Sequence, residues 1–214
     1  MSPVTPDMIN YYVQLLKDLD QLDLYINNAM FWMVVRGRAE PLTVTDVARR
    51  LDVDLDTAIP RTVLEPGQDK VVVLEQSDHG VIVLAANAWI SDPGIWARLT
   101  ENAQAWGFWW LVNNANRLFY AADGDLITEL NVLHASPAEC WGRNPRALDD
   151  YLGAIRALEA QREADDRAGA FDAPPYPRYP EFETALATVE ALTGVRLDLD
   201  RFTREQLSIH APGL

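Results

Sequence analysis

One stretch decides the fold: W-G-F-W-W-L-V-N-N-A-N-R-L-F-Y-A-A-D-G-D, which runs from Trp106 to Asp125. It holds three of the seven tryptophans, two phenylalanines and a tyrosine. Successive side chains of a strand point to opposite faces of a sheet, and here both faces are apolar. This pattern predicts a central strand covered on both sides. Asp123-Gly124 is a strong hairpin signal, so segments 118–122 and 126–132 are predicted to pair.

Helical patterns lie at both ends of the chain. Thr5-Pro6 offers a capping hydroxyl and a proline at the first helical position. Apolar residues then recur at spacings of four and three: Met8, Tyr12, Leu15, Leu19, Leu22 and Ile26. This stripe either packs on the sheet or forms a seam with a second copy of the chain, and we expect the internal role. Further helices are predicted from Pro145 to about Asp166 and from Glu181 to Leu192, with Gly194 as the C-cap.

Short apolar runs at 31–35, 71–75 and 81–86 predict further strands, and compact helices are predicted at 43–51 and after Pro93. The order of elements predicts an α+β fold: a central antiparallel sheet of about five to six strands with helices packed on it, and helices at the N- and C-terminal ends. We expect residues 1–168 to form a single α+β domain. The remaining residues, 169–214, are expected to form a proline-rich crossing and a C-terminal helix packed on the same domain.

The charge is strongly acidic. The 214 residues include 18 Lys and Arg against 32 Asp and Glu, which gives a formal net charge of −14. Such a charge repels nucleic-acid phosphates and anionic lipids, so no direct nucleic-acid or membrane binding is expected. Cys140 is the single cysteine, so no intrachain disulfide can form, and neither a signal peptide nor an apolar run of membrane-spanning length is visible. We expect a reduced, cytoplasmic protein.

Four segments carry a family resemblance: N-x-W at 87–89, W-W-L-V-N-N-A-N-R-L-F-Y-A-A-D-G at 109–124, W-G at 141–142 and L-T-G-V-R-L at 192–197. Together they resemble an uncharacterised family of actinobacterial proteins, a domain of unknown function. An aromatic-Asn-x-Asn strand, an R-F-x-Y-A-x-D-G hairpin and a late L-T-G-V-R-L segment recur in that family. The resemblance covers most of Phe31 to Leu197. It implies a cytoplasmic α+β domain with an accessory or immunity role, and it assigns no catalytic residue.

The most distinctive polar group follows the aromatic strand. Asn114, Asn116 and Arg117 could orient a ligand beside Trp109, because ligand pockets pair apolar walls with a few polar groups. The alternative is turn chemistry, since asparagine tolerates left-handed backbone and hydrogen-bonds its own chain. Turn and packing roles are the first expectation. Trp109, Asn114, Asn116 and Arg117 are nevertheless the candidate binding site.

Metal and catalytic motifs are missing. His79, His134 and His210 lie far apart in the sequence, and no His or Cys pair has the spacing of metal ligands, so neither a metal nor a cofactor is expected. His134 and Cys140 could form a thiol–imidazole pair, but a strand-end histidine beside a buried thiol is the stronger interpretation. No nucleophile motif is recognisable.

Two function classes remain. The first is a non-catalytic, acidic protein-binding module, such as an immunity or accessory factor that engages a basic protein partner. The alternative is a small-molecule binding protein or metal-independent enzyme with a pocket beside the aromatic strands. A homodimer is also possible, in which the apolar stripe of the N-terminal helix packs against the same stripe of a second copy. An enzyme is the less favoured of these interpretations.

Overall fold

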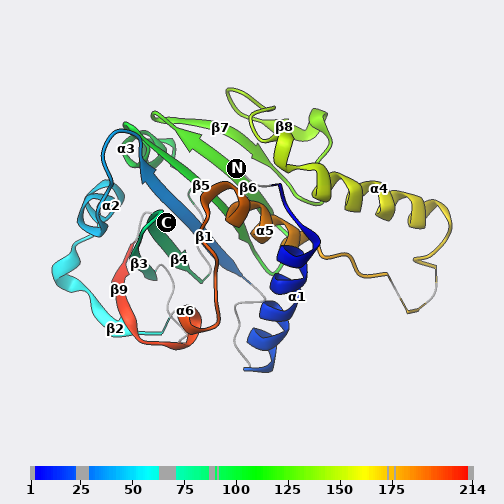
Figure 1. Cartoon of the computed structure of the whole chain (residues 1–214), viewed down its shortest axis with the longest axis horizontal. Helices are drawn as coiled ribbons and strands as arrows, with labels where there is room; N and C mark the ends of the chain where they lie inside the picture. The colour runs from blue at the N-terminus through cyan, green and yellow to red at the C-terminus, as the bar shows by residue number, and fades with distance from the viewer. Residues whose placement is uncertain are drawn as a thin grey trace.

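The computed structural model describes residues 3–22, 29–62, 71–86, 90, 92–172, 174–175 and 177–211. Within them the chain forms one antiparallel sheet of nine strands in the order β2-β9-β3-β4-β1-β5-β6-β7-β8, accompanied by six α-helices (Figure 1). The strands are β1 (Met30–Gly37), β2 (Ile59–Arg61), β3 (Val71–Ser77), β4 (Gly80–Ala85), β5 (Ala103–Trp110), β6 (Asn116–Ala122), β7 (Asp125–Leu130), β8 (Cys140–Trp141) and β9 (Gln206–His210). The helices are α1 (Pro6–Gln21), α2 (Val44–Leu51), α3 (Pro93–Leu99), α4 (Gly153–Arg167), α5 (Glu181–Thr193) and α6 (Asp200–Thr203). None of these described helices combines the length and apolar character needed to cross a membrane.

The α+β prediction with an antiparallel sheet is confirmed, but the predicted count of about five to six strands is wrong. The additional strands β2, β8 and β9 are short, and their own sequences carry too few residues for a period of two to stand out. Their neighbours define them: β9 is hydrogen-bonded between β2 and β3. Pro60 lies in β2 at the edge of the sheet, which is where a proline, with no amide hydrogen to donate, is tolerated in a strand.

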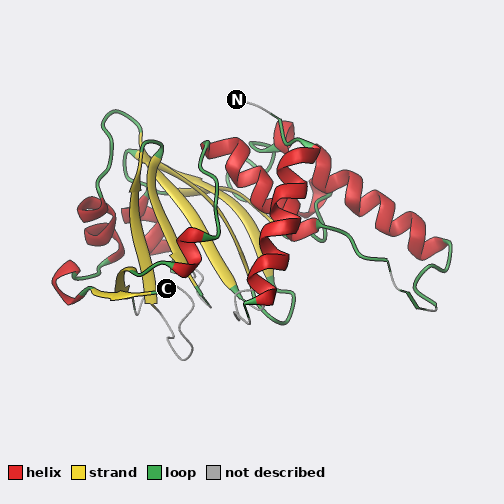
Figure 2. Cartoon of the chain, turned by 60° about the horizontal axis from the view of Figure 1, so that its bottom comes forward, coloured by secondary structure: helices red, strands yellow, loops and turns green. Residues whose placement is uncertain are grey.

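The sheet is covered on both faces, as the aromatic strand predicted. Trp32, Phe108 and Trp110 point to the face that α1, α4 and α5 cover. Phe31 and Phe119 point to the opposite face, which α2 and α3 cover. Figure 2 shows the two groups of helices on either side of the strands. Alternation along β5 therefore separates neighbouring side chains into two cores.

Helix α1 begins as predicted, because the hydroxyl of Thr5 accepts a hydrogen bond from the amide of Met8 at 3.3 Å. The apolar stripe of α1 packs within the same molecule: Tyr12, Leu15 and Leu19 are buried, and the helix packs against α5. Ile26, the last residue of the stripe, lies outside the described residues. Dimerisation through this helix stays a prediction.

Helix α4 begins at Gly153, eight residues after the predicted start at Pro145. A 3-10 turn at Asp149–Tyr151 precedes it. The carboxylate of Asp149 in this turn binds both Arg146, at 3.1 Å, and Arg156, at 2.6 Å, so the turn is tied to the first part of α4. From there α4 extends away from the sheet (Figure 1).

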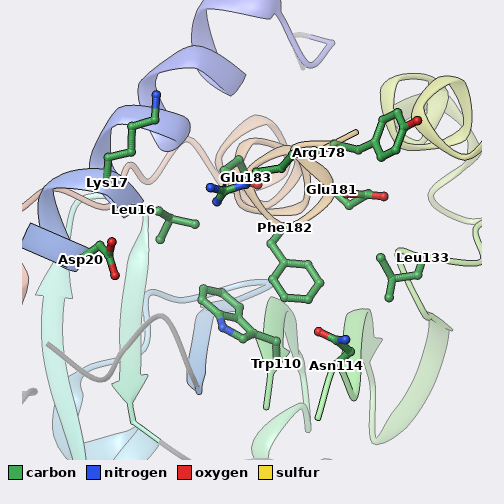
Figure 3. A pocket seen from close by; sticks show the side chains of 11 residues that line it. Leu16, Lys17, Asp20, Trp110, Asn114, Leu133, Arg178, Glu181, Phe182 and Glu183 are labelled. Carbon is green, nitrogen blue, oxygen red and sulfur yellow. Dashed lines mark ion pairs between the residues drawn. The ribbon is translucent and has the colours of Figure 1, made fainter. Parts of the chain in front are cut away.

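The segment after residue 168 returns to the body of the molecule. Helix α5 contributes to the core between α1 and the sheet, and β9 joins the sheet itself. The predicted C-cap is confirmed: Gly194 has a φ of 75°, and its amide donates to the carbonyl of Glu190 at 2.7 Å. The order of these elements places the start of α5 at the same end of the sheet as the β5–β6 turn (Figure 3).

Candidate functional site

A cleft of about 450 Å³ opens at this end of the sheet, between α1, the β5–β6 turn and the start of α5 (Figure 3). Its volume lies within the range of small-molecule sites. The cleft draws residues from both ends of the chain and from the aromatic strand. Its lining residues are Leu16, Lys17, Asp20, Trp110, Asn114, Leu133, Arg178, Tyr179, Glu181, Phe182 and Glu183.

The floor of the cleft is aromatic. Trp110 ends β5 with its indole on the α5 side, and Phe182 points from α5 toward it, with ring centroids 5.4 Å apart (Figure 3). Phe182 also meets Phe108 edge-on, with ring centroids 5.6 Å apart. Contacts of this geometry stabilise aromatic pairs beyond the effect of burial alone. The floor is therefore held by packing from both the sheet and the helix.

Two buried carboxylates stand beside this floor, in the first turn of α5. Glu181 is 8 % exposed and Glu183 is 6 % exposed. Pro180 precedes the helix and supplies no side-chain cap, so carboxylates in the first turn complement the positive end of the helix dipole. Burial raises the pKa of both glutamates, although each accepts a hydrogen bond from its own backbone amide and has an arginine nearby, which act in the opposite direction.

The two carboxylates are held unequally. Glu181 binds the guanidinium of Arg162 at 3.2 Å, and Arg162 also donates to the carbonyl of Leu133. The nearest cation to Glu183 is Arg178, at 3.7 Å, with a side chain that is 82 % exposed. Among the described residues, no side chain donates a hydrogen bond to the carboxylate of Glu183. Glu181 is therefore anchored by a buried arginine that is itself held, whereas the counter-charge of Glu183 is more distant and lies on an exposed side chain.

The burial of Glu183 predicts a pH-dependent stability. Its folded-state pKa lies above the ordinary value of 4.5, so the folded protein binds more protons than the unfolded chain in the window above pH 4.5. The stability that this proton uptake contributes is present below pH 4.5 and is lost as pH rises through the folded pKa. We expect the free energy of unfolding of Glu183→Gln, measured relative to the original protein, to rise as the pH increases above 4.5 and through the folded pKa of Glu183.

Urea unfolding at several pH values measures this difference. Glu163→Gln, on the exposed side of α4, is the control for the loss of one negative charge. A difference between Glu183→Gln and the original protein that stays constant across the window would contradict the prediction.

Of the four residues predicted from the sequence, Asn114 lines the cleft. Its φ of 64° is left-handed, and its neighbour Asn113 accepts a hydrogen bond from the amide of Ala115 at 3.0 Å. Asn116 is completely buried, where it donates to the carbonyl of Asn114 at 2.9 Å and accepts from the amide of Val132 at 2.8 Å. These asparagines shape the turns that border the cleft.

Trp109 and Arg117 are paired across β5 and β6, and Trp109 immediately precedes Trp110. Because neighbouring side chains of a strand alternate, Trp109 and Arg117 lie on the opposite face of the sheet from Trp110. Arg117 pairs with Glu129 at 3.1 Å and lies over the ring of Trp141, 5.2 Å from its centroid. The structure therefore does not bring the four predicted residues together. Strand alternation divides them between two faces.

Sequence reasoning missed the carboxylates of α5. The signal was present: E-F-E-T-A-L-A-T-V-E-A-L-T is apolar or small on all sides apart from its glutamates. A helix of that composition is buried all round, so its glutamates must also be buried. The pattern of α5 could not show the opposite side of the cleft, because Leu16 and Lys17, which line that side, come from the other end of the chain.

The thiol of Cys140 is held as a protonated group. It donates to the carbonyl of Ser136 at 3.5 Å, and burial raises its pKa. In the part of the chain that the structure describes, no group of three or more His, Cys, Asp or Glu side chains is arranged to hold a metal ion. The cleft is consequently the site with the richest chemistry among the described residues.

Comparison of the chain with family models, with curated proteins and with solved structures finds no match. The resemblance to an actinobacterial domain family stays a prediction, and any function must be argued from the cleft itself.

Proposed function

We propose that the protein binds a small organic molecule in the cleft between α1 and α5. One observation carries the proposal: a cavity of about 450 Å³ combines the aromatic floor of Trp110 and Phe182 with Glu183, a buried carboxylate whose nearest cation among the described residues is Arg178, at 3.7 Å. Small-molecule sites have this composition, with apolar walls and a few polar groups that fix orientation.

Binding is favoured over catalysis by the composition of the lining. The raised pKa of Glu183 suits acid–base chemistry. However, the described lining residues include no serine, threonine, cysteine or histidine, and two of the other possible proton carriers are engaged elsewhere: Glu181 pairs with Arg162, and Tyr179 donates to Asp165. A carboxylate on an aromatic floor recognises a ligand without further machinery.

Filling the cleft should abolish binding. Leu16 lines the cleft on α1, and Leu16→Trp is expected to occupy the space that a ligand needs. Leu22 follows the same helix, is 47 % exposed and does not line the cleft, so Leu22→Trp is the matched control. Ligand-observed NMR with 2-phenylethylamine, 3-phenylpropan-1-ol and 3-phenylpropionate measures the effect.

We expect saturation transfer to at least one of these probes from the original protein and from Leu22→Trp, and none from Leu16→Trp. Silence of all three probes with the original protein, or a signal that survives in Leu16→Trp, would count against a ligand site in the cleft.

A second candidate follows from the net charge of −14, which favours association with a basic protein. Such a partner would make the protein an immunity or accessory factor. Affinity capture from a lysate of its own host, with a wash of moderate salt, tests this alternative. One stoichiometric basic protein on the column would support it, and an empty column would leave the cleft as the site of function.

A further inference from the structure

We infer that the ligand of the cleft carries a positively charged amine or guanidine group, which pairs with Glu183 and displaces the side chain of Arg178. This inference rests on the small-molecule binding proposed above and names the class of ligand. It follows from the difference between the ion pairs of the two carboxylates of α5: Glu181 lies 3.2 Å from its arginine and Glu183 lies 3.7 Å from its own.

Arg178 is placed to be exchanged. Its guanidinium lies 3.7 Å from the carboxylate of Glu183, beyond the distance of a direct hydrogen bond, and the side chain is 82 % exposed. The guanidinium is the exposed member of this ion pair, so it can return to water while a ligand cation takes its place beside the buried carboxylate. Glu183 itself is 6 % exposed and keeps its place in the cleft. A ligand cation at hydrogen-bond distance would form a charge-assisted bond that Arg178 does not.

Glu181 does not compete for the same cation. Arg162 holds it at 3.2 Å and is tied in turn to the carbonyl of Leu133. Figure 3 shows the arrangement: Phe182 points to Trp110, with Glu183 on the side of α1 and Glu181 on the side of Leu133. The side of the cleft nearer α1 is therefore where the cation is expected to lie.

An anionic ligand fits the cleft less well. The helix N-terminus would attract an anion, but the first-turn amides of Glu181 and Glu183 already bind their own carboxylates. The buried charges of the cleft are acidic, while Lys17 and Arg178 are exposed and screened by water. An anion would thus be repelled by the two buried carboxylates and attracted only weakly by the two exposed cations.

The aromatic floor favours the same ligand class. Tryptophan and phenylalanine rings attract cations to their faces and also pack against apolar or aromatic groups. The ring centroids of Trp110 and Phe182 lie 5.4 Å apart beside Glu183, and Phe182 is the more accessible of the two rings because Trp110 is 1 % exposed. A ligand with a planar apolar body and an ammonium group would satisfy both the floor and the carboxylate.

Isothermal titration with 2-phenylethylamine, at about 0.15 M salt to screen non-specific attraction, tests the inference on four proteins. Glu183→Gln is expected to weaken binding by about tenfold or more, because the charge-assisted bond is lost. Arg178→Ala is expected to tighten binding by about two- to fivefold, because no cation has to be displaced. Glu163→Gln removes one negative charge from the exposed side of α4 and should leave the affinity unchanged.

Three results would overturn the inference. Equal affinity of the original protein and Glu183→Gln, with binding still blocked by Leu16→Trp, would remove Glu183 from recognition and leave the ligand site intact. Stronger binding of 3-phenylpropionate than of the amine would show that the cleft prefers a negatively charged ligand, and would assign recognition to Lys17 and Arg178. If none of the three probes binds the original protein, the ligand site itself fails, and the inference fails with it.

Discussion

Phe108→Ala is expected to lower the free energy of unfolding by about 4 kcal/mol. Phe108 is completely buried in the central strand β5. Its ring contacts Trp110, with centroids 5.3 Å apart, and Phe182 on α5, with centroids 5.6 Å apart. Alanine would leave a cavity between the sheet and α5, which neighbouring side chains fill only in part because the backbones of both elements are fixed by their own hydrogen bonds.

Urea unfolding measures the loss, and Val112→Ala in the following turn is the control. Val112 is 77 % exposed, so its truncation should change the stability by less than about 0.5 kcal/mol. The cavity also removes support from Phe182, so the affinity of the cleft should fall in Phe108→Ala as well. A loss of stability no greater than that of Val112→Ala would contradict the packing described here.

Gly107→Ala is expected to destabilise the protein by about 3 kcal/mol, through overpacking rather than a cavity. A Cβ atom on Gly107 would overlap the carbonyl oxygen of Trp32 on β1 and the ring of Phe119 on β6. The carbonyl belongs to the backbone of a neighbouring strand and cannot rotate away. The strands around position 107 must therefore separate, or Phe119 must leave its rotamer.

Gly153→Ala is the matched control, because nothing outside the neighbouring backbone of its own helix lies within 4 Å of the position that its Cβ would occupy. Gly153 is the first residue of α4, where alanine restricts the unfolded chain and is compatible with the helix. This substitution should raise the free energy of unfolding by about 0.5 kcal/mol. Thermal or urea unfolding of the two variants side by side separates steric overlap from a general effect of replacing glycine. Equal stability of the two would disprove the close approach at Gly107.

The elements that the sequence predicted well are those with strong local signals. The hairpin at Asp123-Gly124 forms because both residues take left-handed backbone, with φ values of 52° and 86°. Thr5 and Gly194 begin and end their helices through contacts within one helical turn. Each of these features depends on residues that are close in the chain, so a single stretch of sequence contains the whole cause.

The elements that were missed depend on distant partners. Strand β9 exists because β2 and β3, which come from a distant part of the chain, hydrogen-bond to both of its edges. The candidate site shows the same division. The asparagine turn was visible in the sequence, but Trp109 and Arg117 were grouped with Asn114 although strand alternation sends them to the other face.

By itself the amino-acid sequence determined the α+β class, the doubly covered aromatic strand, the acidic charge and the local caps and turns, because backbone preference and apolar periodicity act over a few residues. Only the tertiary structure decided the number of strands, the division of residues between two faces, and the cleft that joins Leu16 to Glu183. Burial and charge pairing at Glu181 and Glu183 arise from the packing of α5 against α1, α4 and the sheet. These properties are set by which segments become neighbours in space, and no short-range pattern in the chain specifies that.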